Sequence, residues 1–217
     1  MQILRENHAN YDSVAQSWDA TRKSAWGEFE FAKHLFSASS ILDAGCGNGR
    51  LVNWLRGNNF TGSYLGIDNS KSLIQKAKQN FPKEKFLQAD LRDFISPQKF
   101  QAIFCIAVLH HFADEKSRLQ VLQNLHASLE KGGRLFLTTW NLFQPRYYRY
   151  LLRNPFSRNC ILPFFGKEKR LIHAFTSSEL IHLLEKAGFH NCEVFPAYKG
   201  KRAKIWKARN LIVLAEK

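Results

Sequence analysis

Short apolar segments alternate with amphipathic segments along most of this chain. The apolar segments have the lengths typical of strands, whereas the amphipathic ones repeat apolar positions every three to four residues, as helices do. The pattern predicts helices at residues 50–59, 70–81, 114–133 and 176–189, with Ser70 as an N-cap and Gly188 as a stop. It predicts strands at residues 40–45, 63–68, 85–90, 101–110, 134–140, 192–198 and 210–217.

The order of these segments indicates an α/β fold. Strands that alternate with helices lie parallel and are joined by right-handed crossovers, so we expect a doubly wound, Rossmann-like sheet of seven strands. The last two strands are joined by a loop near residues 199–207 that leaves no room for a helix, so they should form an antiparallel hairpin. We interpret residues 1–217 as a single domain, with a mostly helical lead-in over residues 1–39 and a less regular basic insertion over residues 141–173.

Composition excludes several classes of protein. The 217 residues are 45% hydrophobic, which suits a globular domain, and no apolar run is long enough to span a membrane. The N-terminal residues lack the apolar core of a secretory signal. The cysteines form no C-x-x-C pair and no Cys/His cluster with zinc spacing, so we expect reduced thiols, a cytoplasmic location and no metal site. These cysteines are Cys46, Cys105, Cys160 and Cys192.

Positive charge is high and uneven. The net charge is +14, and residues 145–217 carry 15 of the 32 lysines and arginines against five of the 18 acidic residues. Such an imbalance favours a polyanionic partner, either a nucleic acid or a membrane surface. A solvated basic face without a partner is the alternative.

The sequence ILDAGCGNGR, residues 41–50, places a glycine loop directly after the first expected strand. Gly45 and Gly47 allow a tight turn and let a ligand approach the main chain closely. The spacing is G-x-G-x-G and therefore differs from the G-x-G-x-x-G of dinucleotide-binding proteins.

Acidic residues stand at the ends of the first three expected strands, namely Asp43, Asp68 and Asp90. A carboxylate at Asp68 can accept the hydroxyls of a ribose but would repel a 2′-phosphate, and the neighbourhood of Asp90 can meet an adenine edge. Such acids disfavour a pyrophosphate and favour a ligand with a sulfonium, an ammonium and a ribose. This chemistry points to S-adenosylmethionine rather than NAD, although each acid taken alone could be a helix N-cap.

Four segments in order, ILDAGCGNGR, YLGIDNS, FLQAD and FCIAVLHH, resemble the cofactor motifs of class I S-adenosylmethionine-dependent methyltransferases. The resemblance covers about residues 40–140 and continues through the terminal hairpin, and it implies that residues 1–39 cover the cofactor. The cofactor-binding residues that the motifs and the lead-in imply are Tyr11, Arg22, Asp43, Gly45, Cys46, Gly47, Asp68, Asn69, Asp90, Leu91 and Ala107.

A narrower resemblance extends to residues 10–35 and to the segments IAVLHHF, HAFTSSELIHLLEKAGF and RNLIVLAEK. These are similar to the tRNA wobble-uridine methyltransferases that esterify a 5-carboxymethyl group. The chain departs from that family at ADLRDF, where the family has a short LP turn, and at WNLFQPRYYRY after the fifth strand. Eukaryotic members work with a small zinc-binding activator, which this resemblance makes a possible partner.

Methyl transfer to a carboxylate needs no general base, because the carboxylate is already ionised at neutral pH. The residues expected at the reaction are Arg22, His110 and His111. Arg22 is expected to hold a carboxylate, either that of the acceptor or that of the methionine part of the cofactor. At least one of the two histidines should contact the acceptor, with a structural role as the alternative.

Two basic, aromatic segments, residues 145–159 and 198–209, follow the carboxyl ends of expected strands and should emerge beside the cofactor. Cations bind phosphates and aromatic rings stack on unpaired bases, so these segments favour RNA contact over a merely solvated face. The residues expected to bind RNA are Arg146, Tyr147, Arg149, Lys201, Arg202, Lys204 and Trp206.

Two other functions remain open from the residues. One is a small-molecule methyltransferase that acts on a quinone precursor or another small acid, since that function needs only the common core. The other is a cofactor-binding subunit without catalysis of its own. tRNA binding should weaken steeply with salt, and this would separate the first alternative from tRNA modification.

Overall fold

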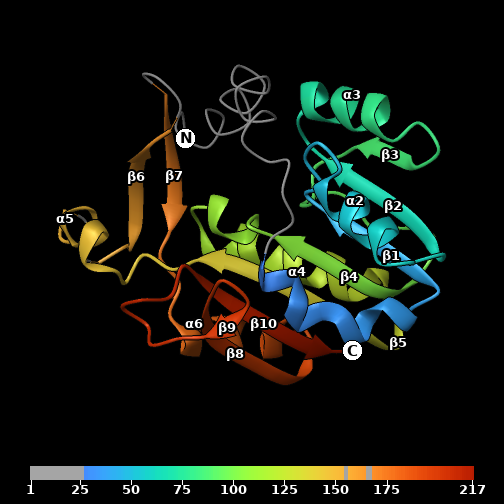
Figure 1. Ribbon diagram of the computed structural model, residues 1–217. Helices are drawn as coiled ribbons and strands as arrows, with labels where there is room; N and C mark the ends of the chain where they lie inside the picture. Colours follow the sequence, from blue (N-terminus) through green and yellow to red (C-terminus); the bar gives the residue numbers. More distant parts are fainter. Residues whose placement is uncertain (1–26, 154–155, 165–167) are drawn as a thin grey trace.

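The computed structural model describes residues 27–153, 156–164 and 168–217 and contains two β-sheets (Figure 1). The large sheet has the strand order β3-β2-β1-β4-β5-β10-β8-β9, and the small one pairs β6 with β7. The strands are β1 (Ser40–Ala44), β2 (Ser63–Asp68), β3 (Lys85–Gln88), β4 (Phe100–Ile106), β5 (Leu129–Trp140), β6 (Asn159–Pro163), β7 (Lys169–His173), β8 (His190–Tyr198), β9 (Lys201–Arg202) and β10 (Asn210–Glu216). The helices are η1 (Gly27–Ser37), α2 (Arg50–Gly57), α3 (Lys71–Asn80), η2 (Leu109–His111), α4 (Glu115–Ser128), η3 (Pro145–Tyr147), α5 (Tyr148–Leu151) and α6 (Ser177–Lys186), where η marks a 3-10 helix.

The large sheet confirms the doubly wound fold. Strands β1 to β5 pair in parallel, and β10 pairs antiparallel with both β5 and β8. The seven expected strands are present, and β9 adds an eighth at the edge. The expectation missed β9 because Lys199 and Gly200, with φ of 51° and 74°, reverse the chain and let two residues pair back onto β8.

Helices cover both faces of the large sheet. One apolar cluster contains Leu122 of α4 and Leu183 of α6, and the other contains Phe29 of η1, Leu55 of α2 and Ile74 of α3. Neighbouring residues of one strand enter opposite clusters, as the two-residue period of a strand requires.

The helix expected at residues 114–133 is shorter than predicted. Helix α4 ends at Ser128, and Leu129 begins β5 by pairing with Phe100. Buried Val121, Leu125 and Leu129 continue the spacing of a helix, so periodicity alone could not separate the last turn from the start of the strand.

Residues 141–173 contain more regular structure than expected. Strands β6 and β7 form an antiparallel hairpin that stands beside the large sheet in Figure 1. The hairpin shares an apolar cluster with α5 and the segment after β5, whose buried members include Leu142, Cys160 and Ile172. Strand β7 also contacts η2, which brings the hairpin to the end of β4.

Candidate active site

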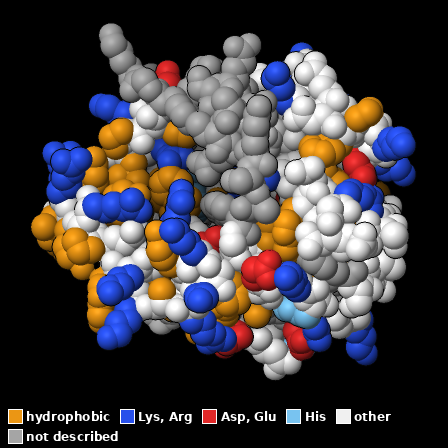
Figure 2. Space-filling model, in the orientation of Figure 1, with side chains coloured by type: hydrophobic (Ala, Val, Ile, Leu, Met, Phe, Trp, Pro, Cys, Tyr) orange, Lys and Arg blue, Asp and Glu red, His pale blue; other side chains and the backbone are white. Residues whose placement is uncertain are grey.

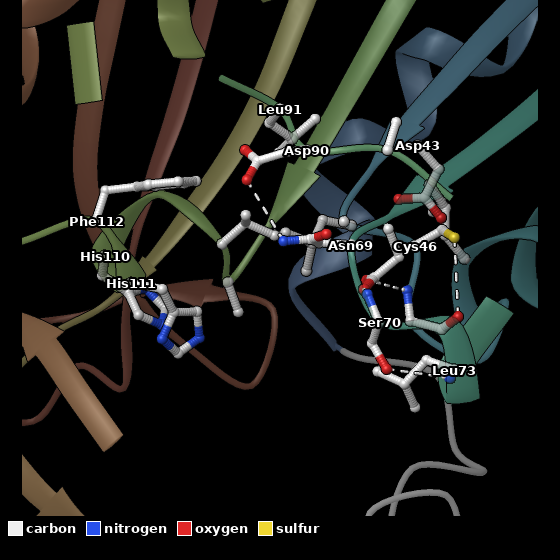
Figure 3. A pocket seen from close by; sticks show the side chains of 18 of the residues that line it. Asp43, Cys46, Asn69, Ser70, Leu73, Asp90, Leu91, His110, His111 and Phe112 are labelled. Atoms are coloured by element: carbon white, nitrogen blue, oxygen red, sulfur yellow. Dashed lines mark hydrogen bonds between the residues drawn. The ribbon is translucent and has the colours of Figure 1, made fainter. Parts of the chain in front are cut away.

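A pocket lies at the carboxyl ends of the parallel strands, where the strand order reverses between β1 and β4. This reversal is where doubly wound sheets bind ligands. The glycine loop, the turns after β2 and β3, and η2 line the pocket (Figure 3). Predicted site residues that line it are Asp43, Gly45, Cys46, Gly47, Asp68, Asn69, Asp90, Leu91, Ala107, His110 and His111.

The glycine loop is closely packed. The backbone N–H groups of Gly45 and Cys46 both donate to the Ile67 carbonyl, at 2.7 and 2.9 Å. Gly45 has a φ of +86°, and a Cβ added there would lie 2.2 Å from Cγ2 of Val108. Only glycine fits this position, because both its conformation and its contact exclude a side chain.

Asp43 is a buried carboxyl group on the pocket wall. Its Oδ2 accepts a hydrogen bond of 2.7 Å from the Tyr64 hydroxyl. Burial raises the pKa of Asp43 to about 7, against the opposing effects of that hydrogen bond and of Arg50, and nearby Asp68 raises it further. A bound cation would therefore stabilise the ionised form of Asp43.

The two other acids have different environments. Both oxygens of Asp68 accept backbone N–H groups, from Gly47 and from Ser70, each at 2.9 Å. This orients the carboxylate at the end of β2. Asp90 instead forms a two-point ion pair with Arg92, at 3.0 and 2.5 Å, and the arginine compensates its charge. The three acids thus differ in the groups that hold them: a hydroxyl for Asp43, backbone N–H groups for Asp68 and a guanidinium for Asp90.

His110 and His111 form the opposite side of the pocket from Asp43 and Cys46 (Figure 3). Burial lowers the pKa of His110 well below its usual value, and the neighbouring His111 and Arg170 lower it further. His110 is therefore neutral at pH 7. Its Nδ1 accepts from the Trp140 backbone N–H at 3.2 Å, which assigns the proton to Nε2.

His111 faces a different partner. Its Nδ1 lies 3.4 Å from the Leu171 carbonyl of β7, and because a carbonyl only accepts, this contact assigns the proton to Nδ1. The histidine side of the pocket is thus tied to the β6–β7 hairpin.

Sequence reasoning missed more than half of the residues that line the pocket, among them Phe29, Arg50, Trp140 and Arg170. Arg170 lies on a strand of the hairpin that was expected to be irregular, so no pattern placed it near the histidines. Arg50 is the last residue of the glycine-loop motif, and Trp140 is the last residue of the expected strand at residues 134–140. Both therefore lie at or after the end of a strand, at the edge where the cofactor was expected, and this position could have identified them as pocket residues.

The residues expected to bind RNA do not line the pocket. The guanidinium of Arg146 lies over the Tyr147 ring at 4.7 Å from its centroid, and Arg149 donates to the Tyr150 hydroxyl at 2.8 Å. Figure 2 shows Lys and Arg side chains interspersed with hydrophobic ones on the left half of the face, where α5 and the hairpin lie in Figure 1.

The second basic segment lies near β9. Arg202 pairs with Glu193 and lies over the Phe195 ring, and Lys204 lies 5.3 Å from the centroid of the half-exposed Trp206 ring. Lys201 is exposed on β9 itself. Tyr11 and Arg22, which were expected at the cofactor and the acceptor, lie outside the described residues.

The described residues offer neither a membrane-spanning helix nor a cluster of metal ligands. No helix among them is long and apolar enough to cross a membrane. In the same part of the chain, no group of three or more His, Cys, Asp or Glu side chains is arranged to hold a metal ion.

Solved structures share this fold. A methyltransferase from Methanosarcina mazei described as dependent on S-adenosylmethionine superposes with a TM-score of 0.69 at 20% identity, covering 85% of this chain and 95% of its own. One described as a DhpI complex with SAM superposes at 0.71 and 17% identity, covering 98% and 97%. The reversal of strand order and the pocket beside it therefore define a class I methyltransferase fold.

The chain belongs to the methyltransferase-domain family, whose match covers residues 16–194. A tRNA (carboxymethyluridine(34)-5-O)-methyltransferase from Schizosaccharomyces pombe is 28% identical over 87% of this chain and 91% of the relative. A relative of that same description from Xenopus tropicalis is 34% identical over 63% of this chain, which spans 21% of the relative's length. These relatives confirm the resemblance to the wobble-uridine family.

The chain is therefore a methyltransferase by family, and solved structures of its fold are described as dependent on or complexed with S-adenosylmethionine. The pocket suits this cofactor on its own chemistry. Asp43 is a buried acid that a cation would ionise, Asp68 is an oriented carboxylate at the end of β2, and Gly45 keeps the loop free of a side chain.

Proposed function

We propose that this chain methylates the carboxylate of a 5-carboxymethyluridine at the wobble position of a tRNA and produces a methyl ester. The observation that carries the proposal is the alignment with the Schizosaccharomyces pombe relative, which extends over 87% of this chain and 91% of the relative. An alignment of that extent is not confined to the cofactor motifs of residues 40–140 and reaches into the rest of the chain.

The polarity of the pocket supports a carboxylate acceptor. Asp43 and Asp68 would hold the ammonium and the ribose hydroxyls of the cofactor, while the opposite side carries neutral His110 and the cation of Arg170. S-adenosylmethionine supplies the methyl group, whose carbon forms a bond to a carboxylate oxygen while its bond to sulfur breaks and the sulfur retains the electron pair. No proton moves, so the task of the protein is alignment, which can contribute about 7–11 kcal/mol.

The test is transfer of labelled methyl from S-adenosylmethionine into tRNA that lacks methyl esters, followed by mild alkaline hydrolysis. We expect label to enter the tRNA and base to release it as methanol, because the product is an ester. Asp68→Ala is the matched variant, and we expect it to transfer no label.

Two other results would contradict the proposal, and each would point to a different acceptor. Label that enters tRNA but resists base would mean methylation of a ring atom or a ribose. A protein that binds S-adenosylhomocysteine but leaves tRNA unlabelled would instead favour a small acid as the acceptor.

A further inference from the structure

Arg170 is a buried arginine near the start of β7 that faces the active-site pocket. Its exposed fraction is 8%, and it lines the pocket together with His110, His111 and Trp140. Its guanidinium carbon lies 4.1 Å from the centroid of the Trp140 ring and 4.4 Å from that of Phe164. Contacts with two aromatic rings hold the planar group in place while leaving its N–H groups directed along its own plane.

The charge of Arg170 has no counterpart among the described residues. No carboxylate of residues 27–153, 156–164 or 168–217 forms an ion pair with it, and its buried Nε has no hydrogen-bond partner there. The buried Nε of Arg118 also has no hydrogen-bond partner among the described residues, but Nη1 of Arg118 donates to the carbonyls of Phe112 and Ala113 at 3.0 and 2.9 Å, and its Nη2 lies 3.8 Å from Glu179. Burying a cation without compensation is unfavourable. Arg170 lacks the carbonyl and carboxylate partners that compensate the charge of Arg118.

The strand that carries Arg170 is anchored at its end. Nδ1 of His173 lies 2.7 Å from Oδ1 of Asn159 on β6, and Nε2 lies 2.8 Å from Oε1 of Glu179 on α6. These contacts fix the hairpin to the helix that packs on the large sheet. Arg170 is thereby held at a constant place relative to the histidines at the end of β4.

We propose that Arg170 binds the carboxylate of the methyl acceptor and is the residue that makes this enzyme select an acid over its neutral analogue. The inference rests on the proposed function. The planar fork of a guanidinium can hold both oxygens of a carboxylate, which fixes the direction from which one oxygen meets the methyl group. The rings of Trp140 and Phe164 set the plane of that fork.

The first test compares two anticodon stem-loops, one with 5-carboxymethyluridine and one with the neutral 5-carbamoylmethyluridine, each bound to the complex with S-adenosylhomocysteine. We expect the wild type to bind the acid more tightly by about 30-fold or more. Arg170→Met should bind the two equally, because the group that distinguishes them is gone. A merely structural role would weaken both stem-loops alike and leave their ratio unchanged.

The outcomes separate the two proposals. A wild type that does not distinguish the stem-loops would overturn the carboxylate acceptor. A wild type that does, with an Arg170→Met variant that distinguishes them equally well, would overturn only the role of Arg170. Arg134→Met is the matched control, since this arginine pairs with Glu216 and does not line the pocket, and it should keep the wild-type ratio.

A second measurement does not depend on RNA or on the folding of Arg170→Met. The Nε–H signal of Arg170 in a nitrogen–proton NMR spectrum of the wild-type complex is assigned from its loss in Arg170→Lys. We expect sodium acetate to shift this signal saturably, and acetamide or sodium chloride not to do so. A signal that acetate leaves in place would overturn the inference whichever RNA the enzyme uses.

Discussion

Asp43 is the residue whose protonation should couple most directly to cofactor binding. Its folded-state pKa of about 7 lies above the ordinary value of 3.8, so the folded protein retains a proton that the unfolded chain has lost between these pH values. The contribution of Asp43 to stability therefore falls as pH rises from about 4 to 7. An ammonium group bound beside the carboxyl group would reverse this preference and expel the proton.

We predict that binding of S-adenosylhomocysteine, which retains the ammonium, releases a large part of one proton at pH 6.5. Isothermal titration calorimetry in two buffers of different ionisation enthalpy measures the number released. Asp43→Asn cannot titrate, so it should release none and should bind more weakly. Equal proton release from Asp43→Asn and the wild type would assign the proton to another group.

Gly45 gives a second prediction at the same scale. Gly45→Ala places a Cβ against the short, branched side chain of Val108 at a φ of +86°, so we expect a loss of about 2–4 kcal/mol in the free energy of unfolding and loss of cofactor binding. Gly57→Ala is the control, because a Cβ there has no atom within 4 Å, and it should be neutral or stabilising. Denaturant unfolding measures both. An unaltered Gly45→Ala would show that the loop can shift without cost.

Among single residues, sequence reasoning succeeded where the chemistry is local. The glycines and acids of the loop belong to contiguous motifs, and the structure brings them into one pocket; their contacts with the cofactor stay a prediction. Arg170 could not be found in this way, because it reaches the pocket only through the pairing of β7 with β6 and the contact of β7 with η2.

At the scale of elements, α4 holds the turn that follows β3. Nδ2 of its buried Asn124 donates to the carbonyls of Leu91 and Arg92, at 3.0 and 2.7 Å. This fixes the backbone beside Asp90 at the pocket wall. A helix on one face of the sheet thus adds to the hydrogen bonds that the turn makes within itself, such as that from the Arg92 backbone N–H to Asp90.

We predict that Asn124→Ala lowers the free energy of unfolding by about 2–3 kcal/mol, because it leaves buried carbonyl groups without partners. The affinity for S-adenosylhomocysteine should fall by about tenfold as the turn loosens. Gln120→Ala is the control: this exposed residue donates to Oδ1 of Asn124 but does not contact the turn, so its effect should be small. Loss of stability in Asn124→Ala with unchanged affinity would mean that the turn keeps its shape without the helix.

Elements were predictable where caps and periodicity agree. Ser70, Asp114 and Thr176 cap α3, α4 and α6 as the Ser, Asp and Thr at those positions suggest. The junction of α4 with β5 was misplaced because Leu129 satisfies both the helical period and the pairing with Phe100. The β6–β7 hairpin was missed because the pairing of its strands is not a local property of the sequence.

At the scale of the whole molecule, the charge of +14 should govern binding of a polyanion. We predict that the tRNA association constant falls with salt concentration and that Lys201→Gln and Lys204→Gln each reduce the slope of its logarithm against log salt by about one. Lys78→Gln, an exposed lysine of α3 that lies far from β9 in Figure 1, should leave the slope unchanged. Filter binding at several salt concentrations measures this, and slopes unaltered by both β9-side changes would remove that segment from the RNA interface.

The two sheets contribute different parts of the pocket. The large sheet carries the cofactor motifs, while Arg170 is contributed by the small one, which has its own apolar cluster of Leu142, Cys160 and Ile172. Evolution can therefore alter the small sheet without disturbing the methyl donor. Lineages that share this core would change their acceptor by replacing one hairpin. A chimaera with the hairpin of a second methyltransferase should keep the methyl donor of the protein that supplies the large sheet and show the acceptor preference of the protein that supplies the hairpin.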